Sequence, residues 1–500
     1  MASFTNYFDI LNHHADTKTS KNAICCESEH VTYAKLNENI GRFGNLLREV
    51  GVKPKDRVVI AIPDSPDSYY AFFGAMKWGA WPTLISPDLS RQDYEYILQD
   101  SQASALITVR GSEAAEAQTP SPLVRLFVDD EVYPSLLAGA AADLNPYRVT
   151  PENIAFLQYT SGSTGNPKGV PHSQADMIFS PRHYAGEVLN MSEKDVVFSA
   201  SKLFFGYGFG NAVTFPVFYG ASAVLLSGKP GPADVLGIVD QYGPTLFFGV
   251  PTLYNMMLKF ITGPVSMPSL RFCVSAGEAL PASYYHLWKE VTGLEIIDGI
   301  GSTEALHIFI SNRPGDVHPG SSGLIVPGYE AKVVGDDGLP VKTGQQGILC
   351  IRGGSTAPCY WNKPKESAKT MLPEGWLRTG DYFVEDEGCY TCLGRQDDLF
   401  KVGGAWVSPP RVEEAVRSHP AIMECAVTSR EYEGLLKPMA YVVLNAGFTG
   451  DMKLTRELRG HVLQRLPDYM CPVQFNYVQE LPKTRTGKVQ RYILKGENGA

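Results

Sequence analysis

The stretch QYTSGSTGNPKGVPHS, residues 158–173, is the most informative segment of this 500-residue chain. Its glycines at 162, 165 and 169 permit positive φ angles and let backbone amides approach a ligand closely. Four hydroxyl side chains and Lys168 add donors and a positive charge, so the loop is either a flexible turn or a cradle for a polyphosphate. It does not have the usual nucleotide-loop spacing, because the second glycine of that pattern would fall on Pro167.

Around this loop, short apolar runs alternate with helix-like stretches. The apolar runs are typical of buried strands and include DRVVIAIP (56–63), SALITV (104–109), ASAVLLS (221–227), PTLFFGVP (244–251) and LRFCVSAGE (270–278). Helices are indicated for YAKLNENIGRFGNLLREVG (33–51) and for PASYYHLWKEVTG (281–293), the latter ending at Gly293. This alternation predicts an α/β fold with largely parallel sheets, in which sites form where strands end and loops begin.

The last fifth of the chain has a different pattern. Residues 394–420 form a strand–turn–helix unit with its own glycine and proline punctuation, and two strand segments and a helix follow. We therefore predict a large N-terminal domain over residues 1–396 and a small, mobile α+β domain over 397–500. The polar pair Asp397-Asp398 is the natural boundary.

Composition excludes several classes of protein. A formal net charge of −9 argues against a nucleic-acid binder, which needs a basic stripe. The N-terminus has no basic region followed by an apolar core, and no uncharged apolar run reaches transmembrane length, so we expect no membrane association and a cytoplasmic location. Nine cysteines without framework spacing indicate free thiols in a reducing compartment, and the CYTC at 389–392 is expected to be structural.

Three charged residues follow glycine-containing turns elsewhere in the chain. Glu304 in GIGSTEALH would be a magnesium ligand if it lay beside a polyphosphate, although a lone glutamate in such a turn is usually just solvated. Asp381 in GWLRTGD could accept two hydrogen bonds from a ribose diol, although alone it is better explained as a turn cap. Lys488 in LPKTRTGKVQR belongs to a basic stretch that would normally be surface decoration.

Five motifs in order resemble the adenylate-forming superfamily, which includes acyl- and aryl-CoA synthetases, peptide-synthetase adenylation domains and firefly luciferase. They are YTSGSTGNPKG (159–169), GIGSTE (299–304), WLRTGD (376–381), GRQDDLFKVGG (394–404) and PKTRTGK (482–488). Each motif alone is weak, but the ordered set covers the chain from about residue 25 to Lys488 and makes a chance match implausible.

The resemblance implies a role for each matching position. The β- and γ-phosphates of ATP would be held by Thr160, Ser161, Gly162, Ser163, Thr164 and Lys168. The adenine and the rest of the nucleotide would be bordered by Gly277, Glu278 and Ala279 and by Asp298, Gly299, Ile300, Gly301 and Ser302. Thr303 would contact the α-phosphate, Glu304 would bind Mg²⁺, and Asp381 with Arg395 would bind the ribose.

The same resemblance implies two reaction steps and a moving domain. Lys488 would stabilise the charge that builds on the α-phosphate while the acid is adenylated. The small domain would then turn about Asp397 so that coenzyme A can attack the acyl-adenylate. The tunnel for the thin pantetheine arm would be lined by Lys401, Gly403 and Gly404, where glycines leave room.

A finer resemblance is to the benzoate–CoA ligase branch, carried by SASKLFFGYGFGNAVTFP (199–216), FFGVPTLYNMML (247–258) and GSTEALHIFISNRPGDVHPGSSG (301–323). It implies an aryl-acid pocket that also borders Gly299 and Ile300 and is lined by Phe205, Gly206, Tyr207, Leu306, His307 and Ile308. Alanine is usual in benzoate enzymes at the position of Gly206, so a slightly larger slot could admit an amino or hydroxyl group on the ring. One methyl is worth about 1–3 kcal/mol, which biases the substrate without settling it.

We therefore expect an ATP- and Mg²⁺-dependent aryl-acid:CoA ligase that acts on benzoate or a small amino- or hydroxybenzoate such as 2-aminobenzoate. Two alternatives stay open. The chain could load an aryl acid onto a carrier protein, or it could bind nucleotide without catalysis, which Lys488, Glu304 and Asp381 argue against. The sequence leaves a monomer and a homodimer equally open.

Overall fold

The computed structural model describes residues 6–27, 29–119, 122–160, 166–403, 405–432, 435–483 and 489–496. Its centre is a thirteen-stranded sheet. The middle of this sheet is parallel and runs, in spatial order, through β13 (Ile296–Gly301), β12 (Phe272–Ser275), β11 (Leu246–Gly249), β9 (Val196–Ser199), β10 (Ser222–Leu225) and β1 (Asn22–Cys26). The apolar runs predicted near residues 221–278 are therefore confirmed as strands.

The parallel strands are buried on both faces, as their continuous apolar sequence requires. On one face, Phe247 and Cys273 pack with α10 (Pro232–Tyr242), α11 (Pro251–Phe260) and α12 (Ala282–Thr292). On the other face, Phe248 and Val274 join a core that includes α1 (Tyr7–Thr17), α2 (Tyr33–Glu49), α3 (Pro66–Trp78) and α9 (Phe215–Tyr219). The predicted end of α12 is confirmed, because Gly293 caps it with a φ of 75°.

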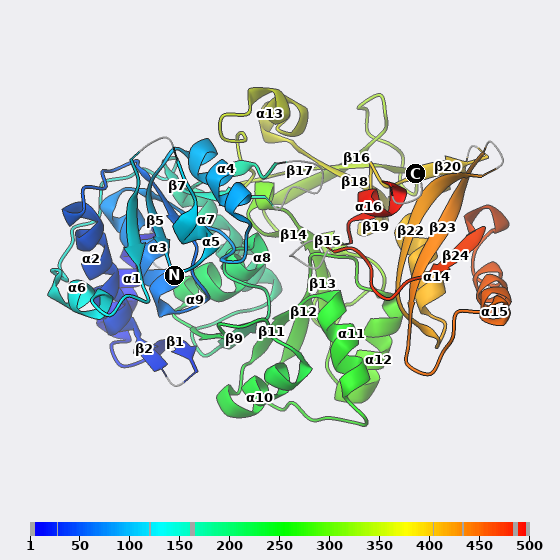
Figure 1. Cartoon of the computed structure of the whole chain (residues 1–500), viewed down its shortest axis with the longest axis horizontal. Coiled ribbons are helices and arrows are strands. Elements are labelled where there is room, and N and C mark those ends of the chain that lie inside the picture. Colours follow the sequence, from blue (N-terminus) through cyan, green and yellow to red (C-terminus); the bar gives the residue numbers. More distant parts are fainter. Residues whose placement is uncertain are drawn as a thin grey trace.

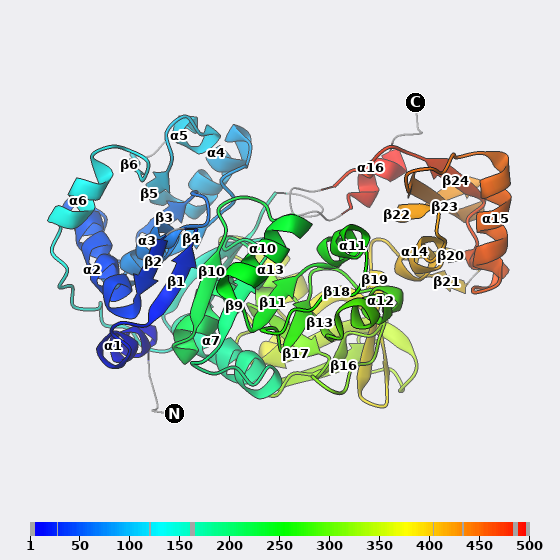
Figure 2. The same cartoon turned by 90° about the horizontal axis from the view of Figure 1, so that it is seen from below.

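A second, four-stranded sheet lies beside α2 and α3, on the left in both views (Figures 1 and 2). It is wholly parallel in the order β4 (Trp81–Leu84), β3 (Arg57–Ile60), β5 (Ala103–Thr108) and β6 (Val124–Phe127). The strands predicted at 56–63 and 104–109 are β3 and β5. The short helices around this sheet are α4 (Arg91–Ser101), α5 (Glu113–Glu116) and α6 (Tyr133–Gly139).

Beyond β13 the large sheet becomes antiparallel, which the prediction of largely parallel sheets did not include. The order outward is β14 (Ile308–Ser311), β15 (Gly323–Ile325), β19 (Cys389–Arg395), β18 (Leu377–Asp386), β17 (Gln346–Gly353) and β16 (Tyr329–Val334), and β2 (Glu29–Thr32) adds an antiparallel edge at the far end. Several of these strands follow one another through loops too short for a helical crossover, so they pair as hairpins. The expected structural role of the CYTC segment fits its place in β19.

Three further segments surround the candidate site. The glycine-rich stretch lies in the chain between the two strands of a hairpin, β7 (Ile154–Tyr159) and β8 (Gly169–Ser173). A helical run follows β8 and contains α7 (Gln174–Ser180) and a π-helical stretch, η1 (Pro181–Val188). A second run contains α8 (Gly206–Phe209), η2 (Gly210–Thr214) and α9, and its η2 is again π-helical, a geometry that is frequent at functional sites.

The small C-terminal domain stands at the opposite end of the molecule from the second sheet (Figures 1 and 2). Its three-stranded sheet contains β22 (Ile422–Tyr432), β23 (Leu435–Leu444) and β24 (Gln474–Tyr477), and a hairpin precedes it, β20 (Phe400–Val402) with β21 (Ala405–Val407). Its helices are α14 (Pro409–Arg417), α15 (Met452–Leu463), the short η5 (Asp468–Met470) and α16 (Arg491–Gly496). Short helical elements in the large domain are η3 (Thr303–Ala305), α13 (Pro364–Thr370) and η4 (Pro373–Gly375). The small domain has its own apolar core around Val412, Val442 and Leu458, and the boundary at residue 397 stays a prediction.

No helix in the described ranges is long and apolar enough to cross a membrane. All nine cysteines are free thiols.

Candidate active site

The neck of the β7–β8 hairpin is closed by two hydrogen bonds. Thr160 N donates to Lys168 O over 2.9 Å, and Lys168 N donates to Thr160 Oγ1 over 3.2 Å. These bonds hold the two ends of the glycine-rich loop together. The residues between them that we expect to bind phosphate, Ser161, Gly162, Ser163 and Thr164, lie outside the described part of the chain.

Tyr360 connects Lys168 to Glu304, and the sequence reasoning missed it. Its hydroxyl donates to Glu304 Oε1 over 2.6 Å, while Lys168 Nζ lies 4.2 Å from the centroid of its ring. The structure therefore brings together the two residues predicted to bind phosphate and metal. A single aromatic residue between Cys359 and Trp361 carries no local signal of this role.

His172 fixes the turn that carries Thr303. The imidazole is fully buried and stacks on Phe156. Its Nε2 lies 2.8 Å from Thr303 O, and its Nδ1 lies 2.9 Å from Asp176 Oδ2. Both neighbours are acceptors, so the ring ties β8 to the GSTE turn from the hairpin side.

Glu304 is suited to one kind of metal site. One carboxylate oxygen accepts the Tyr360 hydroxyl, and the side chain is only partly buried, so the other oxygen can face a cation. In the described ranges, no three His, Cys, Asp or Glu side chains converge as a metal cage. A single carboxylate such as Glu304 fits Mg²⁺, which takes one or two carboxylates and completes its shell with phosphate oxygens and water.

His307 contacts one of the other predicted acid-pocket residues, Tyr207. Its Nε2 faces two acceptors, Asn211 Oδ1 at 3.1 Å and Tyr207 O at 3.3 Å, so this nitrogen carries the proton. Rings of Tyr184, Tyr207 and Phe215 surround the imidazole. Burial lowers the pKa of His307 to about 3, so the pocket holds a neutral ring at physiological pH.

A strained turn places His307 and the Leu306 carbonyl. Leu306 has φ 68° and ψ −43°, and His307 N donates to Ala305 O over 2.8 Å, which together make a γ-turn of the rare, positive-φ kind. The turn directs Leu306 O toward Gly206, where an added Cβ would lie 3.2 Å from that oxygen. Strain of this kind is retained mostly where function requires the geometry.

The buried polar atoms near His307 that have no hydrogen-bond partner within the described residues include Gln158 Oε1 and His307 Nδ1. Gln158 Oε1 would lie 3.6 Å from a Cβ added at Gly206, so it faces the acid pocket from the end of β7. Because buried acceptors normally find donors, a bound ligand is the natural partner for this oxygen.

The segments predicted to border adenine lie partly in strand and partly in loop. Asp298 to Gly301 belong to β13, and burial raises the pKa of Asp298 to about 8. Gly277 has a φ of 95°, which favours glycine. Glu278 and Ala279 line a cleft of about 80 Å³ between the domains, whose other walls include Thr252, Tyr284, Arg417, Lys483 and Val489. Lys483 and Val489 flank the segment that carries Lys488, which itself lies outside the described residues.

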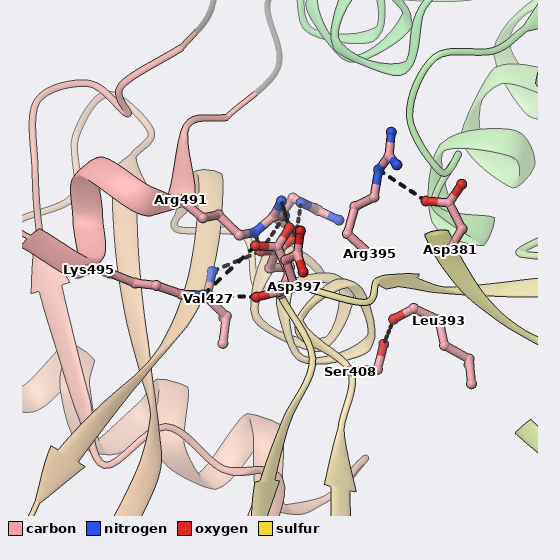
Figure 3. Close-up of polar contacts among 11 residues, drawn as sticks. Asp381, Leu393, Arg395, Asp397, Ser408, Val427, Arg491 and Lys495 are labelled. Carbon is pink, nitrogen blue, oxygen red and sulfur yellow. Dashed lines mark hydrogen bonds and ion pairs between the residues drawn. The ribbon is translucent and has the colours of Figure 1, made fainter. Parts of the chain in front are cut away.

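Asp381 and Arg395, predicted to bind ribose, are direct neighbours across β18 and β19 (Figure 3). Arg395 Nε lies 3.1 Å from Asp381 Oδ1, and this carboxylate raises the pKa of the guanidinium. Thr379 Oγ1 accepts the amide proton of Asp381 over 3.1 Å.

The predicted hinge is held by the last helix. Lys495 Nζ donates to Asp397 O over 3.2 Å, and Arg491 forms ion pairs with Asp398 and with the buried Glu413 (Figure 3). Arg491 Nη2 lies 2.8 Å and 3.0 Å from the two Glu413 oxygens. The predicted hinge residue and residues that follow it are thereby tied to α16.

Two of the predicted CoA-tunnel residues, Lys401 and Gly403, are exposed at the end of strand β20. Lys401 Nζ rests over the Trp406 ring at 4.6 Å, and Gly403 has a φ of 57°. No described atom lies within 4 Å of a Cβ placed at Gly403, so this residue is unpacked in this arrangement of the domains. Gly404 lies outside the described residues.

Residues 11–361 match the AMP-binding enzyme family, and residues 411–488 match the AMP-binding enzyme C-terminal domain. The chain is 43% identical to the benzoate–CoA ligase of Thauera aromatica, over 93% of this chain and 90% of that relative. It is 38% identical to the anthranilate–CoA ligase of Pseudomonas aeruginosa, over 89% and 87% of the two chains. The crystal structure of an anthranilate CoA ligase in complex with anthranoyl-AMP has a TM-score of 0.92 at 36% identity and covers 99% of this chain and 97% of that chain.

Proposed function

The chain belongs to the AMP-binding enzyme family, and from that premise we propose that it is an aryl-acid:CoA ligase for benzoate or a small ring-substituted benzoate such as 2-aminobenzoate. Its relatives include ligases named for benzoate, hydroxybenzoate and anthranilate. It is an acid–thiol ligase of the kind that uses ATP, Mg²⁺ and CoA. The observation that carries the proposal is the cluster of aromatic rings around His307, which lies three residues after Glu304 in the turn that His172 bonds from β8.

In the first step the aryl carboxylate attacks the α-phosphorus of ATP and pyrophosphate leaves. We assign Lys168, which rests over the Tyr360 ring, to the leaving phosphates, and Thr303, whose carbonyl lies beside His172 Nε2, to the α-phosphate. Mg²⁺, when bound at Glu304, would neutralise phosphate charge. We assign Lys488 to the charge that develops on the α-phosphate, because Lys483 and Val489 already line the cleft next to Glu278.

In the second step the CoA thiol attacks the carbonyl of the aryl-adenylate, and AMP leaves with the bonding electrons. A thiol arm needs the space that Lys488 uses in the first step. We propose that the small domain turns about Asp397 and carries the β20–β21 hairpin to the site. The exposed position of Gly403 supports this second arrangement, since this residue is unpacked in the first.

The pocket supports a ring substituent next to the carboxylate. Gly206 leaves space in front of Gln158 Oε1, a buried acceptor at the end of the strand that leads into the phosphate hairpin. An amino group at the 2-position of benzoate lies beside the carboxylate and can donate to such an oxygen. Satisfying a buried acceptor contributes about 1 kcal/mol, enough to favour an amino-substituted acid severalfold.

A panel of acids in a pyrophosphate-release assay tests the proposal. We expect turnover with benzoate and with 2-aminobenzoate when ATP, Mg²⁺ and CoA are present, and weaker turnover with acids substituted at the 4-position. The same panel with a carrier protein in place of CoA identifies the thiol acceptor. Absence of pyrophosphate release with every aryl acid would refute the proposed substrate class.

A further inference from the structure

Tyr360 lies between two groups of opposite charge without belonging to either motif that carries them. We propose that it is a positioning residue that keeps the Lys168 ammonium and the Glu304 carboxylate apart, so that one stays available for phosphate and the other for Mg²⁺. This inference rests on the proposed function and deepens it at the pyrophosphate end of the site.

The hydroxyl of Tyr360 acts on Glu304 as a fixed donor. Tyr360 is 4% exposed, so its hydroxyl is held beside the Glu304 carboxylate largely out of solvent. The 2.6 Å bond occupies Oε1 of Glu304 and sets the plane of the carboxylate. The second oxygen is thereby presented in one direction rather than sweeping through several rotamers.

The ring of Tyr360 acts on Lys168 as a neutral support. Lys168 Nζ rests 4.2 Å from the ring centroid, a cation–π contact that holds the ammonium without neutralising it. An aromatic face is the suitable partner here, because a carboxylate in the same place would form an ion pair. Without the ring, Lys168 and Glu304 could pair directly, which would remove both a phosphate-binding cation and a metal ligand.

The backbone around Tyr360 is tied to both of the elements that it separates. Trp361 N donates to Gly169 O of β8 over 2.8 Å, and Ala357 N donates to Glu304 O over 2.7 Å. Tyr360 N itself donates to Ser367 Oγ over 2.9 Å. These main-chain hydrogen bonds set the distance between the hairpin and the GSTE turn, and the Tyr360 side chain lies between the two.

Two substitutions separate the roles of the hydroxyl and the ring. Tyr360→Phe removes only the donor to Glu304, and Tyr360→Leu removes the donor and the aromatic face. Tyr329→Phe is the matched control, because Tyr329 is also buried and its hydroxyl bonds Ser355 Oγ over 2.6 Å and Ala305 O over 3.4 Å, with no bond to the Glu304 carboxylate in the described structure.

The measurement is ATP binding by isothermal titration calorimetry with and without Mg²⁺, in the absence of any acid, on the full chain. For Tyr360→Phe we expect ATP binding without Mg²⁺ to be unchanged. The Mg²⁺ concentration that gives half of the full increase in ATP affinity should rise roughly tenfold, as is typical when a hydrogen-bond partner of a metal ligand is removed. For Tyr360→Leu we expect metal-free ATP binding to weaken as well. Tyr329→Phe should show neither change.

An unchanged Mg²⁺ response in Tyr360→Phe, or an equal shift in Tyr329→Phe, overturns the role of Tyr360. Because no acid is present, this readout is separate from the proposed function. Suppose that the variants show the expected changes in Mg²⁺-dependent ATP binding but the wild-type chain forms no aryl-adenylate. That result would refute the aryl-acid ligase assignment and would still support Tyr360 as a positioning residue.

Discussion

Replacing Gly206 with alanine should lower the preference of the enzyme for 2-aminobenzoate relative to benzoate. The backbone at Gly206, the first residue of α8, needs no positive φ, so alanine is compatible with it. The new methyl would lie 3.2 Å from Leu306 O and 3.6 Å from Gln158 Oε1. The first distance requires a shift of a few tenths of an ångström, and the second is ordinary van der Waals contact, so the variant should fold.

The magnitude follows from what the methyl covers. It shields Gln158 Oε1 from a ring amino group, which removes a hydrogen bond worth about 1 kcal/mol. It also takes room in the slot, and one methyl changes discrimination by about 1–3 kcal/mol. Together these contributions are about 2–4 kcal/mol, and since 1.4 kcal/mol is a factor of ten, the ratio of kcat/KM for 2-aminobenzoate to that for benzoate should fall roughly thirtyfold to several-hundredfold.

The assay is pyrophosphate release with each acid at saturating MgATP and CoA. Gln158→Leu removes the acceptor while residue 206 keeps no side chain, and it should also lower the ratio. Gly210→Ala is the contrasting variant, because its Cβ would fall 2.1 Å from His307 Cδ2 and should impair both acids together. A Gly206→Ala enzyme with the wild-type ratio would show that Gln158 and Gly206 do not contact the ring substituent.

Three further outcomes are expected. Lys488→Ala should abolish acid-dependent ATP–pyrophosphate exchange while sparing thioester formation from supplied aryl-adenylate, and equal loss of both half-reactions would contradict its role. Burial raises the pKa of Asp298 from 3.8 to about 8, so the folded chain keeps a proton that the unfolded chain has lost. Stability should therefore fall by about 1.4 kcal/mol per unit as pH rises from 5 to 7, and Asp298→Asn should flatten this dependence of Tm; an equal slope in both proteins would exclude Asp298 as the source. Arg491→Ala leaves the Glu413 carboxylate, whose side chain is 4% exposed, without its bidentate partner, and should lower the free energy of unfolding in urea by about 3 kcal/mol. Arg491→Met with Glu413→Met should recover most of that loss, and failure to do so would point to packing instead of charge.

Local sequence patterns were sufficient to predict those strands and helix ends that depend on a few neighbouring residues. Apolar runs such as PTLFFGVP predicted strands, and Gly293 marked a helix end, because side-chain periodicity and left-handed φ are properties of a few neighbouring residues. The antiparallel extension from β14 to β19 was not predicted. Strand direction there depends on which partners pair, and pairing joins residues such as Gly323 and Tyr390 that are far apart in the chain.

The candidate site divides in the same way. The sequence by itself determined the family, through five ordered motifs, and from them the kinds of group needed for a phosphate loop, a metal ligand and a ribose clamp. It also indicated an aryl pocket around His307. These conclusions need only residue type and order.

The tertiary structure alone decided which other groups complete the site. Tyr360 reaches Glu304 and Lys168, Gln158 faces Gly206, and His172 bonds Thr303 only because the hairpin, β13 and the segment before α13 fold onto one another. Each of these contacts joins segments that are distant in sequence, and no local propensity encodes them. Contacts of this kind arise from strand order and loop closure, which packing of the whole chain determines.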